Sequence, residues 1–475
     1  MASQQSKLVE EVNEHQLFNK GEHGEHTIKY KRQVAEIGYK NCCSCLEANN
    51  VCNCVMEVDA NDDFAKGIVA TTGSQEHPDA NSSFTHSVIN MIGMLIGLGQ
   101  LSTPYALENG GWSSIFLLVG LGVICAYTSH VMGKCLKQSP KSRNYQDIGE
   151  LAFGGKGRFV AAFFIYSEIF LALVSYTISL GDNLATIFHN KHIYITWMNI
   201  STRHLLTIMA VFISLPSLWL RDFSSISFLS SGGIIMSLMI FATVSWTAIS
   251  WGAKANHRIP ALQLQNIPGI SGLYMFSYAG HVVFPDIYRA MKDPSKFTKV
   301  SITSFSIVII LYSSLAFMGA KMFGGGVSSQ ITLSMPPHLI ATKIALWATV
   351  LTPMTKYALE FAPIAIQLEN ALPHFMSSRL KHAIRAAIGS FVLLSILFLA
   401  LTIPYFQYVL GFTGSLISVG VCIILPSLFY IKISGSQISR ATIALNVIFI
   451  VIGTLLGVFG TISSGKSLLR SISQA

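Results

Sequence analysis

The chain has 475 residues, of which 51% are hydrophobic and only 12% are charged, about half the charged fraction of a typical soluble protein. Its net charge of +9 is unevenly distributed: residues 1–83 hold 7 Lys and Arg against 13 Asp and Glu, whereas residues 84–475 hold 25 against 10. In the second part the basic residues lie between apolar runs, as topology signals do. Composition therefore indicates a protein embedded in a lipid bilayer and excludes a nucleic-acid partner.

Residues 1–83 are predicted to be a disordered, acidic cytosolic tail. They contain no long apolar run, which excludes a signal peptide and disfavours a packed domain. Five of the eight cysteines fall in this segment, at Cys42, Cys43, Cys45, Cys52 and Cys54. Paired C-x-C spacing can hold a soft metal, whereas reduced or lipidated thiols need no surrounding fold. We favour thiols without a metal, and we expect the protein to have no metal or other cofactor.

Eleven apolar runs follow the tail, each close to the 20 or so residues that cross a bilayer. We therefore expect an all-α polytopic membrane protein with a transmembrane domain at residues 84–475. Its eleven helices are expected near 84–107, 112–134, 159–181, 204–220, 225–251, 267–290, 299–322, 339–362, 384–403, 408–430 and 441–461.

The loops between these helices predict the orientation. With the tail in the cytosol, the predicted cytosolic loops hold 16 Lys and Arg and the opposite loops hold 7. Cytosolic loops carry such an excess in membrane proteins, so the N-terminus is expected in the cytosol and the C-terminus outside it or in a lumen. The sequon that begins at Asn199 falls on the luminal side, but it lies too close to the fourth helix for us to expect glycosylation.

The first predicted helix is interrupted by Gly93, Gly97, Gly99 and Pro104, in GMLIGLGQLSTPYALENGG at residues 93–111. A helical glycine costs about 1 kcal/mol relative to alanine, and an interior proline about 3 kcal/mol. In a bilayer, irregular backbone is tolerated only where it is buried in protein or lines a cavity. The alternative is that the G-x-x-x-G spacing of Gly93 and Gly97 only lets another helix approach closely.

A second interrupted run lies five helices later, at residues 271–291, and contains Gly272, Gly280 and Pro285. Interrupted segments in corresponding positions of two inverted halves indicate a binding site near the bilayer midplane. Free N–H groups at the start of a half-helix suit a carboxylate, and freed carbonyls suit an ammonium. We therefore predict a site for a zwitterionic amino acid. Its residues are Gly93, Gly97, Leu98, Gly99, Gln100, Ser277, Tyr278, Ala279 and Gly280.

Four segments carry a family resemblance: GLGQLSTPYALENGGW (97–112), YAGHVVFPDIYRAM (278–291), LGDNL (180–184) and PMTKYAL (353–359). They resemble the amino acid/auxin permease family, and within it the plant vacuolar amino-acid transporters related to the vesicular inhibitory amino-acid transporter. The resemblance implies a five-plus-five inverted-repeat fold of the leucine-transporter type, with helices 1 and 6 broken and an eleventh helix added. It also implies proton-coupled amino-acid transport at a vacuolar or other endomembrane. Gln100–Thr103 and Asp286 depart from the family's usual aliphatic stretch and Asn, and both departures bear on substrate choice or coupling.

Three residues are candidates for carrying the proton. Glu168 lies inside the third predicted helix, where a carboxyl can load and release a proton or stay protonated in a hydrogen bond to a neighbouring helix. His281 either titrates near neutral pH or is a buried structural residue. Asp286 either caps a half-helix or relays a proton. Lys356 and Glu360, four residues apart, are expected to neutralise each other near the cytosolic boundary, with a lysine that replaces a sodium ion as the alternative.

Catalytic motifs are not found, and we expect a protein that is not an enzyme. Residues 460–467 match G-x-x-x-x-G-K-[ST], but a phosphate loop must follow a soluble strand, so this match is rejected. The predicted function is secondary active transport of amino acids by alternating access. The alternative is an amino-acid sensor that signals through its cytosolic tail, and the uniformly apolar helices disfavour a channel. The sequence carries no signal of oligomeric state.

Overall fold

The computed structural model describes residues 81–139, 142–189, 201–214, 223–252, 258–371 and 377–474. The predicted tail up to residue 80, with its five cysteines, and the sequon at Asn199 lie outside the described residues. The described residues belong to one compact unit, Pro78–Ala475. Their secondary structure elements are all helices, and an isolated bridge between Ser82 and Met291 is the β-type pairing found among them.

Helices lie over every apolar run that the sequence predicts. The first five runs contain α4 (Phe84–Leu95) with α5 (Gly99–Gly110), α6 (Ser114–Gln138), α7 (Tyr145–Ile187), α8 (Thr202–Ser214) and α9 (Phe223–Trp251). The next three contain α10 (Ile267–Ser277) with η4 (His281–Val283) and α11 (Phe284–Ala290), α12 (Phe297–Phe323), and α14 (Ile340–Ala371), which follows the short α13 (Ile331–Ser334). The last three contain α15 (Ser378–Thr402), α16 (Phe406–Thr413) with α17 (Leu425–Ser434), and α18 (Arg440–Gln474). Two π-helical segments, η7 (Gly414–Ser418) and η8 (Gly420–Ile424), join α16 to α17.

Seven of the described helices are long and apolar enough to cross a membrane, or eight when the bent pair α4 and α5 counts as one span. The protein is therefore an all-α polytopic membrane protein. That criterion is not met by α8, by α10 with α11, or by α14. The count of eleven spans therefore stays a prediction.

Several helices extend beyond the ranges that the sequence predicts. The third helix begins at Tyr145 and not at residue 159, because Asn144 and Asp147 form a capping box there, which satisfies two backbone donors at a helix start. A kink at Phe153 and Gly154, where Gly154 has a φ of +64°, then separates the first two turns from the long span. Helices α14 and α18 also run beyond the predicted ranges.

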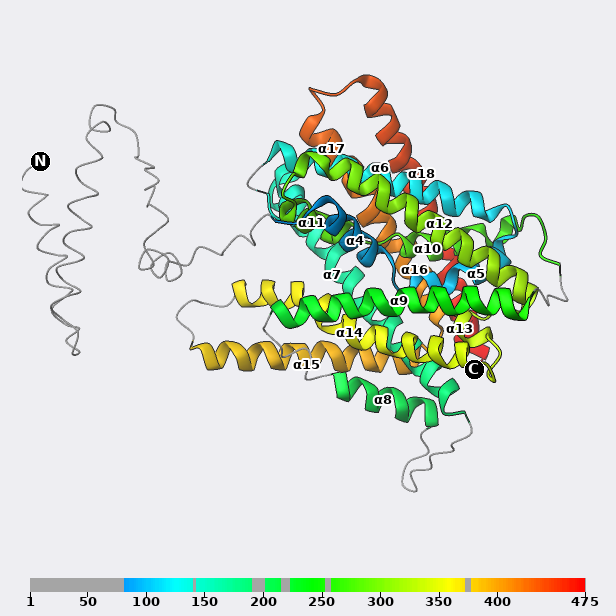
Figure 1. Cartoon of the computed structure of the whole chain (residues 1–475). Coiled ribbons are helices and arrows are strands. Elements are labelled where there is room, and N and C mark those ends of the chain that lie inside the picture. Colours follow the sequence, from blue (N-terminus) through cyan, green and yellow to red (C-terminus); the bar gives the residue numbers. More distant parts are fainter. Residues whose placement is uncertain are drawn as a thin grey trace, which may run out of the picture. The chain divides into compact units, whose positions relative to one another are not determined.

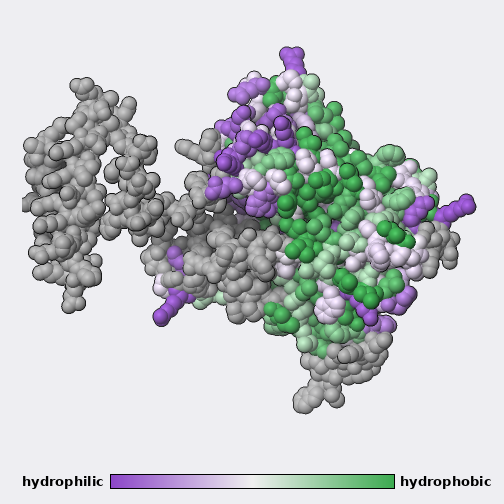
Figure 2. Space-filling model, viewed as in Figure 1, coloured by the Kyte–Doolittle hydropathy of each residue, from purple (hydrophilic) through white to green (hydrophobic). Residues whose placement is uncertain are grey.

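The two broken helices lie in the interior of the bundle (Figure 1). Helix α5 packs against α10 and α12, α4 packs against α12, and α10 also packs against α16 and α18. Helix α14 packs against both α7 and α9. The outer helices leave apolar side chains exposed: Phe116, Ile249 and Phe391 are 77%, 81% and 71% exposed. Figure 2 shows hydrophobic residues across the middle of one face and hydrophilic residues toward its edges, as expected for a surface in contact with lipid.

The first and sixth helices run antiparallel and are tied together at both ends. Near the start of α4, the Ser82 N–H donates to the Ala290 carbonyl at the end of α11 (3.0 Å). At the opposite end, the Gln263 N–H before α10 donates to the Gly110 carbonyl that ends α5 (2.9 Å). Gly111 follows with a φ of +80°, a conformation that other residues rarely adopt. These bonds place the two breaks side by side.

Candidate functional site

The first break lies between α4 and α5, whose axes meet at 58°. The chain is extended at Ile96, and α5 begins at Gly99 without a side-chain cap. The break frees two carbonyls at the end of α4. The Tyr312 hydroxyl donates to the Leu95 carbonyl at 2.6 Å, and the Lys356 ammonium donates to the Ile96 carbonyl at 3.3 Å.

Pro104 lies inside α5 and not at the break. A proline has no N–H, so it leaves the carbonyl four residues earlier, that of Gln100, without its helical donor. The Thr103 hydroxyl donates to that carbonyl at 3.0 Å, and the Ser102 hydroxyl donates to the Gly99 carbonyl at 3.0 Å. The polar residues of this stretch thus satisfy backbone carbonyls next to the break.

The second break separates α10, which ends at Ser277, from η4 and α11. Tyr278 and Ala279 turn the chain, with their N–H groups donating to the Met275 and Phe276 carbonyls (both 3.1 Å). Tyr278 is fully buried, and its hydroxyl has no hydrogen-bond partner.

The two breaks touch each other. A Cβ atom at Gly99 would lie 2.5 Å from Ser277 Cα, a distance that only glycine permits. Tyr312 Oη, which is bonded to the Leu95 carbonyl, also lies 3.1 Å from the Ser277 carbonyl. We call the residues Gly97–Gly99 and Ser277–Gly280, together with Lys356, the helix-break site.

Two predicted site residues face a different helix. A Cβ atom at Gly93 would lie 2.3 Å from Cδ1 of Ile234 in α9, so Gly93 permits close helix packing. The Gln100 side chain donates to the Ser237 carbonyl of α9 at 3.3 Å, and its Oε1 atom has no partner. The predicted alternative of close packing therefore describes Gly93, whereas Gly97 and Gly99 lie at the break.

Lys356 is the residue whose position the sequence interpretation got wrong. Its ammonium lies at the first break and not near the cytosolic boundary, and its side chain is only 5% exposed. A Cβ atom at Gly97 would lie 3.3 Å from Lys356 Nζ and 3.4 Å from the Tyr176 hydroxyl. The absence of a side chain at Gly97 thus lets both polar groups reach the break. A lysine within an apolar run was the signal in the sequence, but the packing of α14 against α7 and α9 was not.

Glu168 lies on α7 among buried residues of the bundle, and its Oε1 atom has no hydrogen-bond partner. It interacts electrostatically with Glu360 of α14. The other two proton candidates lie in the sixth helix.

His281 contacts α6. Its Nε2 atom is 3.0 Å from Thr128 Oγ1 and 3.2 Å from the Cys125 carbonyl, and the centroid of its ring lies 4.7 Å from that of the Phe284 ring.

Asp286 lies in the first turn of α11, and its side chain is exposed. A negative charge at this position favours the helix start through the helix dipole. His281 and Asp286 both lie in the second half of the sixth helix, whereas the Lys356 ammonium and the Tyr176 hydroxyl approach the first break.

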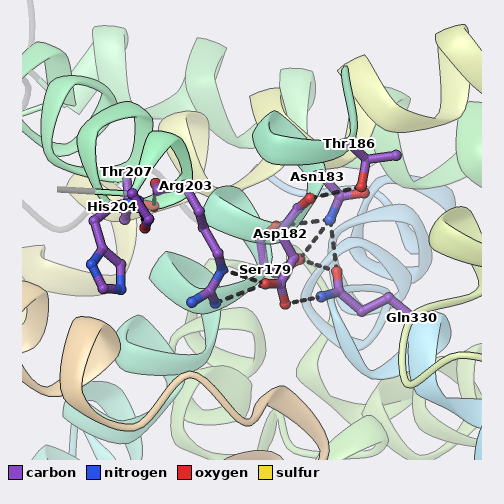
Figure 3. Close-up of polar contacts among 9 residues, drawn as sticks. Ser179, Asp182, Asn183, Thr186, Arg203, His204, Thr207 and Gln330 are labelled. Carbon is purple, nitrogen blue, oxygen red and sulfur yellow. Dashed lines mark hydrogen bonds and ion pairs between the residues drawn. The ribbon is translucent and has the colours of Figure 1, made fainter. Parts of the chain in front are cut away.

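A second polar group lies where α7 ends, and sequence reasoning did not assign it a role (Figure 3). Asp182 accepts hydrogen bonds from Arg203 of α8 (2.8 Å) and from the Gln330 amide (3.0 Å). The Gln330 Oε1 atom accepts from Ser179 (2.5 Å) and Asn183 (2.7 Å). We call Ser179, Asp182, Asn183, Arg203 and Gln330 the Asp182 cluster. It fastens the segment before α13 to α7 and α8.

A cavity of about 200 Å³ lies between α5, α10, α16 and α18. Its polar lining includes Asn109, Asn266, Gln407 and three serines of α18, and it reaches Leu273, one turn before Ser277. The serines belong to the rejected phosphate-loop match, whose residues lie within the continuous helix α18. In the part of the chain that the structure describes, no group of three His, Cys, Asp or Glu side chains could hold a metal ion.

Comparisons with known proteins give the family of the chain. The family described as "Transmembrane amino acid transporter protein" matches residues 80–464. The chain belongs to this family. The resemblance found in the sequence is thereby confirmed, and it extends over nearly the whole described region.

Named relatives are transporters. "Amino acid transporter AVT1H" from Arabidopsis thaliana is 55% identical over 434 residues, which cover 91% of this chain and 98% of the relative. "Amino acid transporter AVT1E" from the same plant is 37% identical over 389 residues, covering 82% and 74%. The "Vesicular GABA transporter" of Caenorhabditis elegans is 23% identical over 435 residues, covering 89% and 87%. None of these names is that of an enzyme.

Proposed function

We propose that the protein is a secondary active transporter that carries amino acids across the vacuolar or another endomembrane by alternating access, coupled to protons. The observation that carries this proposal is the contact of two helix breaks inside the bundle, at Gly99 and Ser277. Broken helices at corresponding positions of two repeats are typical of transporter substrate sites. The names of the relatives support amino acids as the substrate class.

The proposed architecture is the five-plus-five inverted repeat with an eleventh helix, preceded by a cytosolic tail at residues 1–83. The antiparallel course of the first and sixth helices supports this arrangement. The excess of basic residues in the predicted cytosolic loops supports a cytosolic N-terminus and a luminal C-terminus. In this orientation the cavity between α5, α10, α16 and α18 opens on the luminal side and leads toward the breaks.

In the proposed complex, the carboxylate of the substrate lies at the uncapped start of α5, near Leu98 and Gly99. Its ammonium lies near the carbonyls that end α10, around Ser277 and Tyr278. Helix starts favour anions and helix ends favour cations, so a zwitterion is stabilised at both ends. Gly280, in the second break, lies against the end of α4, because a Cβ atom there would lie 3.2 Å from Leu95 Cδ2.

The proposed coupling group is Glu168. It is buried, has a carboxyl oxygen without a partner and lies within electrostatic range of Glu360. A carboxyl group in such surroundings is a functional candidate because burial makes its charge costly. The hydrogen bonds and ring contacts of His281 support a structural role for that residue, and the exposure of Asp286 supports a role at the helix start.

Uptake into proteoliposomes tests the proposal. Purified protein is reconstituted and given radiolabelled L-alanine, L-leucine, L-glutamate, L-lysine or γ-aminobutyrate, with and without an imposed pH gradient. We expect at least one of them to accumulate only with the gradient, and a protonophore to abolish the accumulation. Protein-free liposomes are the control. Binding without accumulation under either condition would contradict transport and favour the sensor alternative.

A further inference from the structure

The Tyr312 side chain of α12 lies between the two breaks and belongs to neither of the broken helices. Its hydroxyl oxygen is 2.6 Å from the Leu95 carbonyl, where α4 ends, and 3.1 Å from the Ser277 carbonyl, where α10 ends. The side chain is fully buried. The last carbonyls of two half-helices therefore converge on one oxygen atom that a third helix supplies.

Both carbonyls stand at helix ends, where the next turn that would supply an N–H donor is missing. Each helix end also carries a partial negative charge. A tyrosine hydroxyl has a single hydrogen, so the Leu95 and Ser277 carbonyls must share the one hydrogen of Tyr312. The donor capacity at this point is thus half of what the two carbonyls can accept.

An ammonium group is a stronger partner for these carbonyls than the hydroxyl is. It has three hydrogens and a positive charge, and charge-assisted hydrogen bonds are roughly twice as strong as neutral ones. In the proposed complex the ammonium of the amino acid lies at the Ser277 carbonyl. The hydrogen of Tyr312 then bonds fully to the Leu95 carbonyl, and both carbonyls have a donor.

The return passage of a transporter differs, because it is made without the amino acid. In alternating access the site is closed from both sides at one point of every passage. A buried carbonyl without a donor is costly, and on the return passage no substrate ammonium supplies one. The Tyr312 hydroxyl is a donor within reach of both the Leu95 and the Ser277 carbonyl while the backbones of Gly99 and Ser277 touch.

We infer that Tyr312 is a positioning residue for the return passage: its hydroxyl takes the place of the substrate ammonium between the Leu95 and Ser277 carbonyls. This inference rests on the proposed function and adds Tyr312 to its site. The group that replaces the hydroxyl must be an ammonium with at least one N–H. The substrate class is therefore amino acids with such an ammonium, and trimethylated forms are excluded.

Efflux from proteoliposomes separates the return passage from the loaded one. Vesicles are loaded with a radiolabelled amino acid that accumulates in the transport panel, and a protonophore is present so that no pH gradient acts. Dilution into buffer without amino acid measures net efflux, which requires return passages without substrate. Dilution into excess unlabelled amino acid measures exchange, in which both passages carry substrate.

Tyr312→Phe removes the hydroxyl and keeps the ring. We expect net efflux to fall about tenfold or more, because the two carbonyls lose their donor on the return passage. Exchange should stay within about threefold of wild type, because the ammonium supplies the donors in both of its passages. A merely structural role would lower both rates together, and a loss of proton coupling would leave net efflux intact.

The matched control is Tyr274→Phe, which makes the same chemical change within α10. Tyr274 is as deeply buried as Tyr312, but its hydroxyl is hydrogen-bonded to the Ser114 hydroxyl of α6 (3.1 Å) and not to a carbonyl at a break. Net efflux and exchange should change by the same factor in this variant. The ratio of the two rates should therefore stay that of the wild type.

A second measurement uses the wild-type protein and does not depend on the folding of a variant. The unlabelled N-methyl form of the same amino acid keeps two N–H groups on its ammonium and should stimulate efflux from outside. The N,N,N-trimethyl form has the same charge but no N–H, so it cannot donate to the carbonyl that the hydroxyl releases. We expect it to give no stimulation.

Three results would overturn the inference. The first is a wild-type ratio of net efflux to exchange in Tyr312→Phe, and the second is an equal loss of both rates in a Tyr312→Phe protein with the wild-type Tm. The third is stimulation by the trimethyl form equal to that by the N-methyl form. If no amino acid of the panel accumulates with wild-type protein, the proposed function itself fails, and the inference falls with it.

Discussion

The Asp182 cluster and the helix-break site are both polar and largely enclosed by helices, but they differ in how completely their hydrogen-bonding groups are satisfied. In the Asp182 cluster, both carboxylate oxygens and both atoms of the Gln330 amide have partners. Around the helix-break site, Gln100 Oε1, Tyr278 Oη and Glu168 Oε1 have none. Unsatisfied buried polar atoms are costly and rare.

The difference indicates a structural role for the Asp182 cluster and a binding role for the helix-break site. A fully satisfied buried network makes the structure rigid, which suits the fastening of the segment before α13. Polar atoms without partners next to a helix break are available to a ligand. The following substitutions test this distinction, from the largest expected effect to the smallest.

Gly99→Ala should strongly reduce amino-acid uptake. Its Cβ atom would lie 2.5 Å from Ser277 Cα, a backbone atom that cannot move without separating the breaks. Overpacking costs about 1–3 kcal/mol, and the upper value corresponds to a loss of affinity of roughly a hundredfold. Amino-acid uptake into proteoliposomes measures the effect.

Gly120→Ala is the matched control, because a Cβ atom at Gly120 in α6 would meet nothing within 4 Å. It should leave uptake unchanged. Wild-type uptake by well-folded Gly99→Ala would contradict the placement of the site between the breaks.

Gln330→Leu should affect stability and not substrate binding. It leaves the Ser179 hydroxyl and one Asp182 oxygen without the partners they have now. Orphaned buried groups cost about 1–3 kcal/mol each, so we expect a loss of roughly 2–3 kcal/mol, measured as a lower Tm of the detergent-purified protein. Affinity for the amino acid should stay within about twofold of wild type.

The control for this substitution is Thr186→Val, at a neighbouring exposed residue that donates only to the Asp182 backbone carbonyl (2.9 Å). It should change Tm little. A large loss of affinity in Gln330→Leu would show that the Asp182 cluster takes part in substrate binding, against the comparison drawn above.

The helix-break site was predictable from the sequence in its backbone and less so in its side chains. Glycines within an apolar run are costly, so Gly97, Gly99 and Gly280 indicate the breaks in the sequence itself. Their contacts depend on helix packing. Gly93 faces α9, whereas Gly97 faces Lys356. The sequence could not distinguish them, because the two glycines form one G-x-x-x-G pair in the same apolar run.

Lys356 and Gln330 show the same limit at the level of side chains. The spacing of Lys356 and Glu360 predicted that they interact, but not that the ammonium reaches the Ile96 carbonyl on another helix. Gln330 lies in a connection between helices, and its partners lie about 150 residues earlier in the chain. No local sequence pattern predicts such contacts, because periodicity shows only which face of a single helix is apolar.

Thr103→Val is expected to have the smallest effect, and it tests how the first break is supported. Valine has the same shape but removes the donor to the Gln100 carbonyl, which Pro104 cannot replace. One hydrogen bond contributes about 1 kcal/mol, so Tm should fall slightly, with a modest loss of uptake because Gln100 lies next to the break.

The control is Thr454→Val on lipid-facing α18. There the Ile450 carbonyl loses the hydrogen bond from the threonine hydroxyl (2.7 Å) but keeps its helical N–H donor. Equal behaviour of the two variants would mean that the carbonyl freed by Pro104 needs no donor, and that the polar residues of this stretch act on the substrate instead.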